Sequence, residues 1–305
     1  MRRSTLTADL LLLLTAAIWG FAFVAQRMGM DYVGPFTYNG VRFALGSLSL
    51  VPLLRRGPEP VLGQQGPRLL WLGGGLLGLV LFAAASLQQV ALVTTTAGKA
   101  GFITGLYVVI VPFLGLLWGQ RTAAGTWAGA LCAAVGLYLL SVTASWEMEY
   151  GDVLVLVSAV FWSFQVLLIA WLSPRVRTVS LACYQFAICA LLSLLTAFWV
   201  EEVRLAAILS AAGPILYGGL LSVGVAYTLQ VVAQRHAPPA HASILMSLEA
   251  VFAAFGGWLF LEEALTPRGW AGCGLMLAGM LLSQLGGPGE RRKECREPGA
   301  VRRDA

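Results

Sequence analysis

Long apolar segments recur along almost the whole chain, and they constrain its fold more than any other feature. Ten can be marked, at residues 9–27, 36–54, 69–90, 98–118, 123–143, 153–171, 179–200, 214–234, 241–261 and 268–286. Each is close to the about 20 residues that a helix needs to cross about 30 Å of hydrocarbon. Only 11% of the residues are charged, roughly half the share in soluble domains. The sequence therefore predicts an all-α integral membrane protein with ten transmembrane helices.

Basic residues are concentrated on one side of these predicted spans. If the N-terminus is cytoplasmic, 15 of the 20 Lys and Arg residues fall in cytoplasmic segments, six of them in the tail, and four fall on the other side. This positive-inside pattern predicts a protein integral to the plasma (cytoplasmic) membrane with both termini cytoplasmic. The charges lie in short loops rather than on a folded basic face, which argues against nucleic-acid binding.

The chain also matches itself at an offset of 143 residues. In this register Trp19 falls on Trp162, Phe43 on Phe186 and Trp127 on Trp270, and with an offset of 142 the segment SLQQVA at 86–91 falls on TLQVVA at 228–233. The sequence thus predicts two five-helix repeats, residues 1–143 and 144–286, followed by a basic cytoplasmic tail, 287–305, expected to be disordered. Because five is odd, the second repeat enters the membrane from the opposite side, and such inverted repeats are typical of carriers.

Two stretches resemble a known family, the ten-helix drug/metabolite transporters with paired EamA domains. They are TTTAGKAGFITGLYVVIVP at 94–112 and SLEAVFAAFGGWLFLEEALTPRGWAGCGLMLAGMLL at 247–282, and the resemblance extends over roughly residues 8–286. The first repeat departs from the family pattern, with GQRTAAGTW at 119–127 where a carboxylate is common. The resemblance implies a secondary transporter or exporter of small metabolites with a central cavity that opens alternately to each side.

Glu249 lies near the middle of the ninth predicted span. A charged group at that depth costs on the order of 3 kcal/mol, so the carboxyl must face a cavity, pair with another group or stay protonated. One interpretation is a solute- or proton-binding site in a transport pathway. The other is a structural ion pair with Arg42, which lies at a similar depth in the second predicted span.

Several other polar or aromatic residues lie within the predicted spans or at their edges and are candidates for the same pathway. On the repeat register Glu249 falls on Tyr107, and inversion brings both toward the centre. Trp19 and Trp162 could supply walls to the pocket, although packing alone would also explain them. Gln88, Gln89, Gln165 and Gln230 are amides that either contact solute or bind neighbouring helices. Pro112 predicts a kink in the fourth span.

Lys99 and His241 occupy equivalent positions at the starts of the fourth and ninth predicted spans. They are candidates for gating or recruiting charges, or else they simply reach the membrane interface. The five cysteines show no CxxC or Cys/His spacing, so no metal, cofactor or disulfide framework is predicted. The chain also has no P-loop, HExxH or paired Asp arrangement, which argues against an enzyme and against direct ATP coupling.

The sequence therefore predicts a secondary transporter, an exporter, of small metabolites such as amino acids or related amphipathic compounds. Its partners are a small-molecule solute, the lipid bilayer and, as a candidate coupling ion, the proton. Two alternatives stay open: a flippase for lipids or hydrophobic solutes, and a membrane scaffold that transports nothing. A scaffold gains nothing from inverted duplication or from an acid at mid-membrane. Duplication within one chain also removes the need for a partner half.

Overall fold

The computed structural model describes residues 2–54, 66–117, 119, 122–141, 150–260 and 267–285, and all regular structure within them is helical. The helices are α1 (Arg2–Gly29), α2 (Pro35–Leu54), α3 (Gly66–Ala91), α4 (Ala97–Gly105), α5 (Tyr107–Leu117), α6 (Ala124–Ser141), α7 (Tyr150–Leu172), α8 (Thr178–Val200), α9 (Leu205–Ser210), α10 (Ala212–Leu216), the π-helix η1 (Tyr217–Tyr227), α11 (Thr228–Gln234), α12 (Pro239–Met246), α13 (Glu249–Phe260) and α14 (Pro267–Leu285). Every predicted span falls on one or more of these helices. The predicted tail at 287–305 lies outside the described residues.

Most of these helices are long and apolar enough to cross a membrane. Among the described residues seven segments qualify by length and hydropathy, and the remaining predicted spans correspond to α2, α6 and α14. Large apolar side chains on the outer surface are exposed, for example Leu117 at 81% and Trp199 at 82%. A bundle that presents apolar side chains outward is suited to a hydrocarbon surrounding. The prediction of an all-helical membrane protein is confirmed.

The second helices of the two halves, α2 and α8, run in opposite directions. Arg177, at the start of α8, donates a hydrogen bond from Nη2 to the carbonyl of Leu54, at the end of α2 (3.3 Å). At the other end, the Glu201 carboxylate accepts hydrogen bonds from the backbone N–H groups of Phe36 and Thr37 (both 2.8 Å). The start of each helix therefore lies beside the end of the other. This antiparallel pairing is the inversion that the odd number of helices per repeat predicts.

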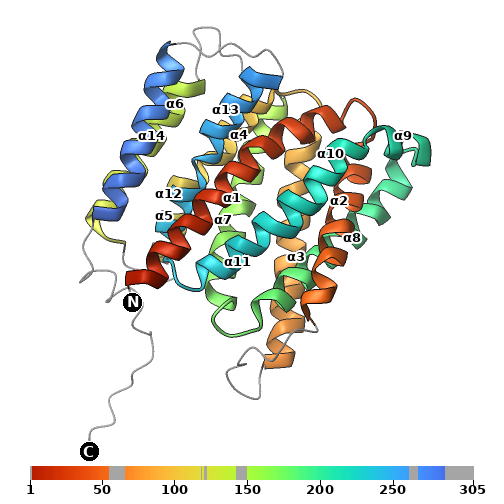
Figure 1. Ribbon diagram of the computed structural model, residues 1–305, viewed down its shortest axis with the longest axis horizontal. Coiled ribbons are helices and arrows are strands. Elements are labelled where there is room, and N and C mark those ends of the chain that lie inside the picture. Colours follow the sequence, from red (N-terminus) through yellow and green to blue (C-terminus); the bar gives the residue numbers. More distant parts are fainter. Residues whose placement is uncertain are drawn as a thin grey trace, which may run out of the picture.

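The last helices of the halves, α6 and α14, lie side by side at one edge of the bundle (Figure 1). Gly136 and Gly279, equivalent positions in the repeat, allow this close approach. A Cβ on Gly136 would lie 2.7 Å from a backbone oxygen of α14, and a Cβ on Gly279 would lie 2.7 Å from a backbone oxygen of α6. Only glycine fits at such contacts, as in other closely packed membrane helices.

The fourth and ninth spans are both broken near their midpoints. In the fourth span the Leu106 N–H donates to the Ile103 carbonyl (3.2 Å), and in the ninth the Leu248 N–H donates to the Leu245 carbonyl (3.4 Å). These are i to i+3 bonds, which tighten the helix into a 3₁₀ turn. Pro112, for which the sequence predicts a kink, lies inside α5, six residues after the break at Leu106.

The eighth span also departs from regular α-helix. Its middle, η1, is a π-helix, whereas its counterpart in the first repeat, α3, is α-helical throughout. Two carbonyls of η1 accept bonds from α1: Ser222 O from Trp19 Nε1 (3.3 Å) and Ala226 O from Thr15 Oγ1 (3.2 Å). π-Helical turns are rare and concentrate at functional sites.

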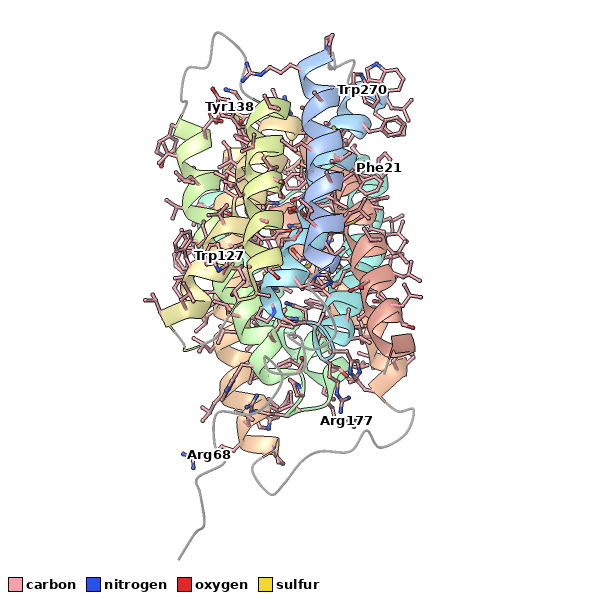
Figure 2. All side chains as sticks on the ribbon, turned by 90° about the vertical axis from the view of Figure 1, so that its left-hand side faces the viewer. Phe21, Arg68, Trp127, Tyr138, Arg177 and Trp270 are labelled. Atoms are coloured by element: carbon pink, nitrogen blue, oxygen red, sulfur yellow. The ribbon has the colours of Figure 1, made fainter. Side chains whose placement is uncertain are left out.

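Charged and aromatic side chains mark the two ends of the bundle. Figure 2 shows Arg68 and Arg177 at one end and Tyr138 and Trp270 toward the other. The Arg268 guanidinium lies 5.2 Å from the centre of the Tyr138 ring, a cation–π arrangement at a distance where such contacts are favourable. The first end is the one that the sequence predicts to be cytoplasmic.

Candidate functional site: a polar cavity between the two halves

A narrow cavity lies at the centre of the bundle, between the two halves of the chain. Its walls come from α1, α2, α3, the broken spans, α7, η1 and α11. The lining residues are Trp19, Phe23, Gln26, Arg42, Gln88, Thr104, Tyr107, Trp162, Gln165, Val166, Ser222, Tyr227, Gln230, Met246 and Glu249. The space among them measures about 30 Å³, enough for about two water molecules. The cavity is thus polar but contracted.

Two groups of opposite formal charge face this cavity. The side chains of Arg42 and Glu249 are almost completely buried, with exposed fractions of 1% and 3%. Within the described residues no ion pair joins them, and the Glu249 Oε1 atom has no hydrogen-bond partner. A charge buried at such depth is expected to serve a site or a pathway.

Arg42 is held in place from its own helix. Its Nε donates to Asn39 Oδ1 (2.9 Å), and Asn39 in turn donates from Nδ2 to the Ala85 carbonyl on α3 (3.0 Å). The guanidinium carbon lies 4.8 Å from the ring centre of Phe43 and 5.4 Å from that of Tyr38. These contacts fix the stem and one face of the guanidinium, while the group lines the cavity without an acidic partner among the described residues.

The helix breaks determine where Glu249 and Tyr107 lie. Tyr107 is the first residue of α5 and Glu249 the first residue of α13, so each directly follows the break in its span. The Tyr107 hydroxyl, like Glu249 Oε1, is buried without a hydrogen-bond partner in the described part of the chain. Discontinuous helices at a repeat interface are a common way to build transporter binding sites.

Tyr227 is the centre of an aromatic cluster on the cavity wall. Its ring centre lies 4.5 Å from that of Trp19, 5.9 Å from Trp162, 6.0 Å from Phe43 and 5.8 Å from Phe186. The four surrounding rings are two pairs of equivalent residues from the two repeats. Such offset and tilted rings form a rigid apolar wall.

Amide side chains supply the remaining polar surface. Gln88 Oε1 accepts from Trp162 Nε1 (2.8 Å) and from Thr104 Oγ1 (3.4 Å), and its Nε2 donates to Gln26 Oε1 (3.3 Å). In contrast, both polar atoms of Gln165 and the Oε1 of Gln230 are buried without partners among the described residues. Unpaired buried amides are costly, so these atoms are available to a polar ligand.

Eight of the eleven residues singled out from the sequence line this one cavity: Trp19, Arg42, Gln88, Tyr107, Trp162, Gln165, Gln230 and Glu249. Gln89 and His241 do not, and neither does Lys99. Its Nζ lies 3.2 Å from Oδ2 of Asp152, near the start of α7, and so it lies at one end of the bundle. His241, the equivalent of Lys99, lies against Asp9 with an Nε2–Oδ1 distance of 2.9 Å.

Sequence reasoning missed several lining residues, Tyr227 above all. The repeat register offered no signal for it, because its counterpart in the first half is Ala85. Thr104 and Ser222 are polar residues inside predicted spans, and that property alone could have identified them, whereas Gln26 lies at the end of the first predicted span. Within the described part of the chain no group of three or more His, Cys, Asp or Glu could hold a metal ion.

Inverted helical halves around a buried polar cavity define a class of membrane transport proteins. Comparison with known proteins agrees: the EamA-like transporter family matches residues 6–142 and, a second time, residues 149–285. The chain belongs to this family, as its resemblance to the drug/metabolite transporters implies. It is therefore a membrane transporter built from a duplicated unit, and not an enzyme.

Individual relatives support the same assignment. An Archaeoglobus fulgidus protein named "Uncharacterized transporter" is 32% identical over 284 residues, covering 92% of this chain and 86% of that protein. The Escherichia coli "Uncharacterized inner membrane transporter YedA" is 26% identical over 277 residues, 88% of each chain. A solved crystal structure of another protein superposes with a TM-score of 0.73 at 20% identity, over 91% of this chain and 96% of that chain, and shows the fold alone.

Proposed function

We propose that the protein is a secondary transporter that exports small metabolites, such as amino acids or related amphipathic compounds, by alternating access. The observation that carries this proposal is the cavity that combines Arg42, Glu249 and unpaired amides with an aromatic wall. A compound with a carboxylate, an ammonium group and an apolar part would satisfy all of these groups at once. The outward direction is proposed from the family resemblance alone, and flux measured in both gradient directions tests it.

The contracted space supports alternating access. A cavity of about 30 Å³ is far smaller than the roughly 300–1,000 Å³ typical of ligand pockets. A metabolite can therefore enter only if the helices around the cavity move apart. Inverted repeats provide two related ways for them to do so, one toward each side of the membrane.

Glu249 is the residue that we propose for coupling to protons. It is the cavity's acidic side chain, and Oε1 is unpaired in the described structure. A carboxyl at this depth can carry a proton in one direction and release it when the cavity opens to the other side. Arg42 would bind the anionic group of the solute in the same cycle.

We also propose that both termini face the cytoplasm and that the protein resides in the cytoplasmic membrane. The name of the Escherichia coli relative places that protein in the inner membrane. Arg68 and Arg177 lie at a common end of the bundle (Figure 2), in agreement with the positive-inside pattern. Fusion of a cytoplasm-sensitive reporter to the C-terminus would test the orientation.

The decisive experiment is a flux screen in proteoliposomes. Purified protein would be tested with amino acids, their derivatives, sugars and hydrophobic amines, in both gradient directions and with or without a proton gradient. We expect flux of at least one zwitterionic or amphipathic metabolite, and a lower apparent affinity for it in Arg42→Gln. Movement of a fluorescent phospholipid without metabolite flux would instead indicate a flippase, and no flux at all would contradict the proposal.

A further inference from the structure

Two pairs of side chains join the halves of the molecule at opposite ends. The first pair is Asp9 and His241, with Oδ1 and Nε2 2.9 Å apart, and the second is Asp152 and Lys99, with Oδ2 and Nζ 3.2 Å apart. Both aspartates are buried within the bundle. The first pair lies near the starts of α1 and α12, and the second near the starts of α7 and α4.

The two pairs are copies of one arrangement. Asp9 and Asp152 are 143 positions apart, and Lys99 and His241 are 142 positions apart, which are the two offsets of the internal repeat. Each pair connects the first helix of one repeat to the broken helix of the other. The sequence suggests the equivalence of Lys99 and His241, but the structure supplies their aspartate partners.

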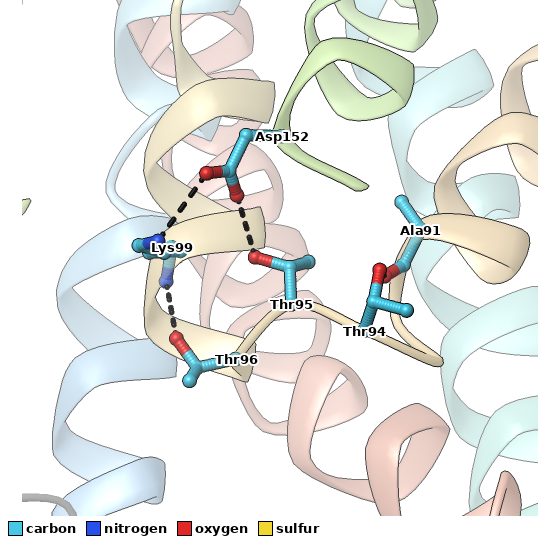
Figure 3. A network of polar contacts seen from close by, with 6 residues as sticks. All are labelled: Ala91, Thr94, Thr95, Thr96, Lys99 and Asp152. Carbon is cyan, nitrogen blue, oxygen red and sulfur yellow. Dashed lines mark hydrogen bonds and ion pairs between the residues drawn. The ribbon is translucent and has the colours of Figure 1, made fainter. Parts of the chain in front are cut away.

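The second pair belongs to a larger polar network (Figure 3). Asp152 Oδ1 accepts a hydrogen bond from Thr95 Oγ1 (2.8 Å), so each carboxylate oxygen has a partner. The neighbouring Thr96 caps α4, where its Oγ1 accepts from the Lys99 N–H (3.2 Å). The start of α4 is thereby tied to the start of α7.

The cavity lies between the two pairs. Trp19 follows Asp9 by ten residues on α1, and Trp162 follows Asp152 by ten residues on α7. At about 1.5 Å per residue, each pair lies roughly 15 Å along the helix from the cavity, one toward each end. The break at Leu106 separates Lys99 from α5, and the break at Leu248 separates His241 from α13.

We propose that the Asp9–His241 and Asp152–Lys99 pairs are two locks that close opposite ends of the transport cavity. Release of one lock lets α12 swing away from α1 about the Leu248 break, and release of the other lets α4 swing away from α7 about the Leu106 break. Alternating access requires that only one lock be open at a time. The proposal rests on the proposed function, because locks matter only to a carrier that opens at each end.

Hydrogen–deuterium exchange of the full-length protein in lipid nanodiscs tests the two locks separately. We expect Asp9→Asn to raise amide exchange about threefold or more in α12 and in the first turns of α1, with no rise in α4. Asp152→Asn should do the reverse, raising exchange in α4 and at the start of α7. If Asp152→Asn does not fold, Lys99→Met replaces it, since the Lys99 side chain is already 29% exposed.

Two further variants control the experiment. Asp31→Asn removes the acid of the exposed Arg27–Asp31 pair, which joins the last turn of α1 to the turn that follows it and reaches no second helix, and should change neither end. His241→Lys introduces the residue that the other repeat uses and should keep its lock closed. The proposal would be overturned if either aspartate variant raised amide exchange equally at both ends of the bundle, or if neither variant raised it.

The exchange measurement needs no solute, so the two proposals can fail independently. If exchange is end-specific while the wild-type protein moves no solute, the locks stand and the proposed function fails. If the protein transports solute but neither aspartate variant has an end-specific effect, the locks fail and the proposed function stands.

Discussion

The two broken spans share the same type of backbone turn and carry different side chains directly after it. Both tighten into a 3₁₀ turn, after Ile103 in one and after Leu245 in the other. The residue that begins the second half of the span is Tyr107 in the first repeat and Glu249 in the second. Likewise Arg42 of α2 is replaced at the equivalent position of α8 by Gln185. The duplication therefore accounts for the backbone around the cavity, whereas Glu249 and Arg42 each occur in only one of the two repeats.

The largest loss of proton-driven flux is expected when Glu249, the acid of the second repeat, is replaced. In Glu249→Gln, flux driven by a proton gradient should be abolished because the amide cannot take up and release a proton at this depth. Folding should be retained, since the amide has nearly the same shape. The measurement is solute flux in proteoliposomes under an imposed pH gradient.

The matched control is Tyr107→Phe, at the equivalent position of the first repeat. It removes a hydroxyl and no charge, so proton-driven flux should fall by only a few-fold. Full proton-driven flux in Glu249→Gln would show that the carboxyl is not the coupling group. Equal losses in the two variants would show that the difference between the repeats has no functional meaning.

A smaller loss is expected at Arg42. Arg42→Gln gives the first repeat the residue that the second repeat already has at Gln185. A hydrogen bond to a charged group contributes about 1.5–3 kcal/mol, so the affinity for a solute with an anionic group should fall about 10- to 100-fold. Binding calorimetry or concentration-dependent flux would measure it. Gln185 does not line the cavity, and Gln185→Ala should leave the affinity within about twofold; a larger effect there would contradict the assigned asymmetry.

The two repeats also differ in how closely their helices approach. A Cβ on Gly20 would lie 2.2 Å from Phe252 Cβ and 2.7 Å from the Glu249 carbonyl, whereas the equivalent of Gly20 in the second repeat is Ser163. Gly20→Ala should destabilise the protein by about 1–3 kcal/mol, the usual cost of overpacking. Reversible unfolding in denaturing detergent would measure it. Ser163→Ala should destabilise the protein by less than about 1.5 kcal/mol. Equal costs for the two variants would mean that the close contact between α1 and α13 does not require glycine at position 20.

The smallest effect on solute affinity is expected at the equivalent tryptophans, Trp162 and Trp19. Trp162 donates to the Gln88 side chain at 2.8 Å, whereas Trp19 donates to a backbone carbonyl at 3.3 Å. Trp162→Phe removes a bond of about 0.5–1.5 kcal/mol and leaves Gln88 less well oriented, so solute affinity should fall about 2- to 10-fold. Trp19→Phe should have the weaker effect, and the opposite order would show that Gln88 is not a solute contact.

Much of the architecture could be predicted because it follows from apolar length and from duplication. The spans, their inversion and the placement of Tyr107 and Glu249 at one cavity all follow from the repeat period and the odd number of helices per repeat, which are visible in the sequence. Mid-membrane polar residues identified most of the cavity because such residues are expensive unless they face one.

The rest depends on tertiary contacts that leave no local signal. Neither break has a proline at the residue where it occurs, and Pro112 lies six residues after the first break, inside α5. Tyr227 could not be found by symmetry because its counterpart is an alanine. The partners of Lys99 and His241 lie 53 and 232 positions away, a pairing that only the folded bundle determines.

The burial of Arg42 has a consequence for how the chain is made. Its side chain packs beside residues of the second half, including Gly218, where an added Cβ would lie 3.3 Å from Arg42 Cδ. During synthesis α2 reaches the membrane well before η1 and α8 leave the ribosome. The nascent first half therefore holds an uncovered cation, at a cost of roughly 2.5–3.5 kcal/mol for a group at mid-bilayer. The Arg42 side chain of α2 is fully covered only after η1, which is translated much later, has packed against it.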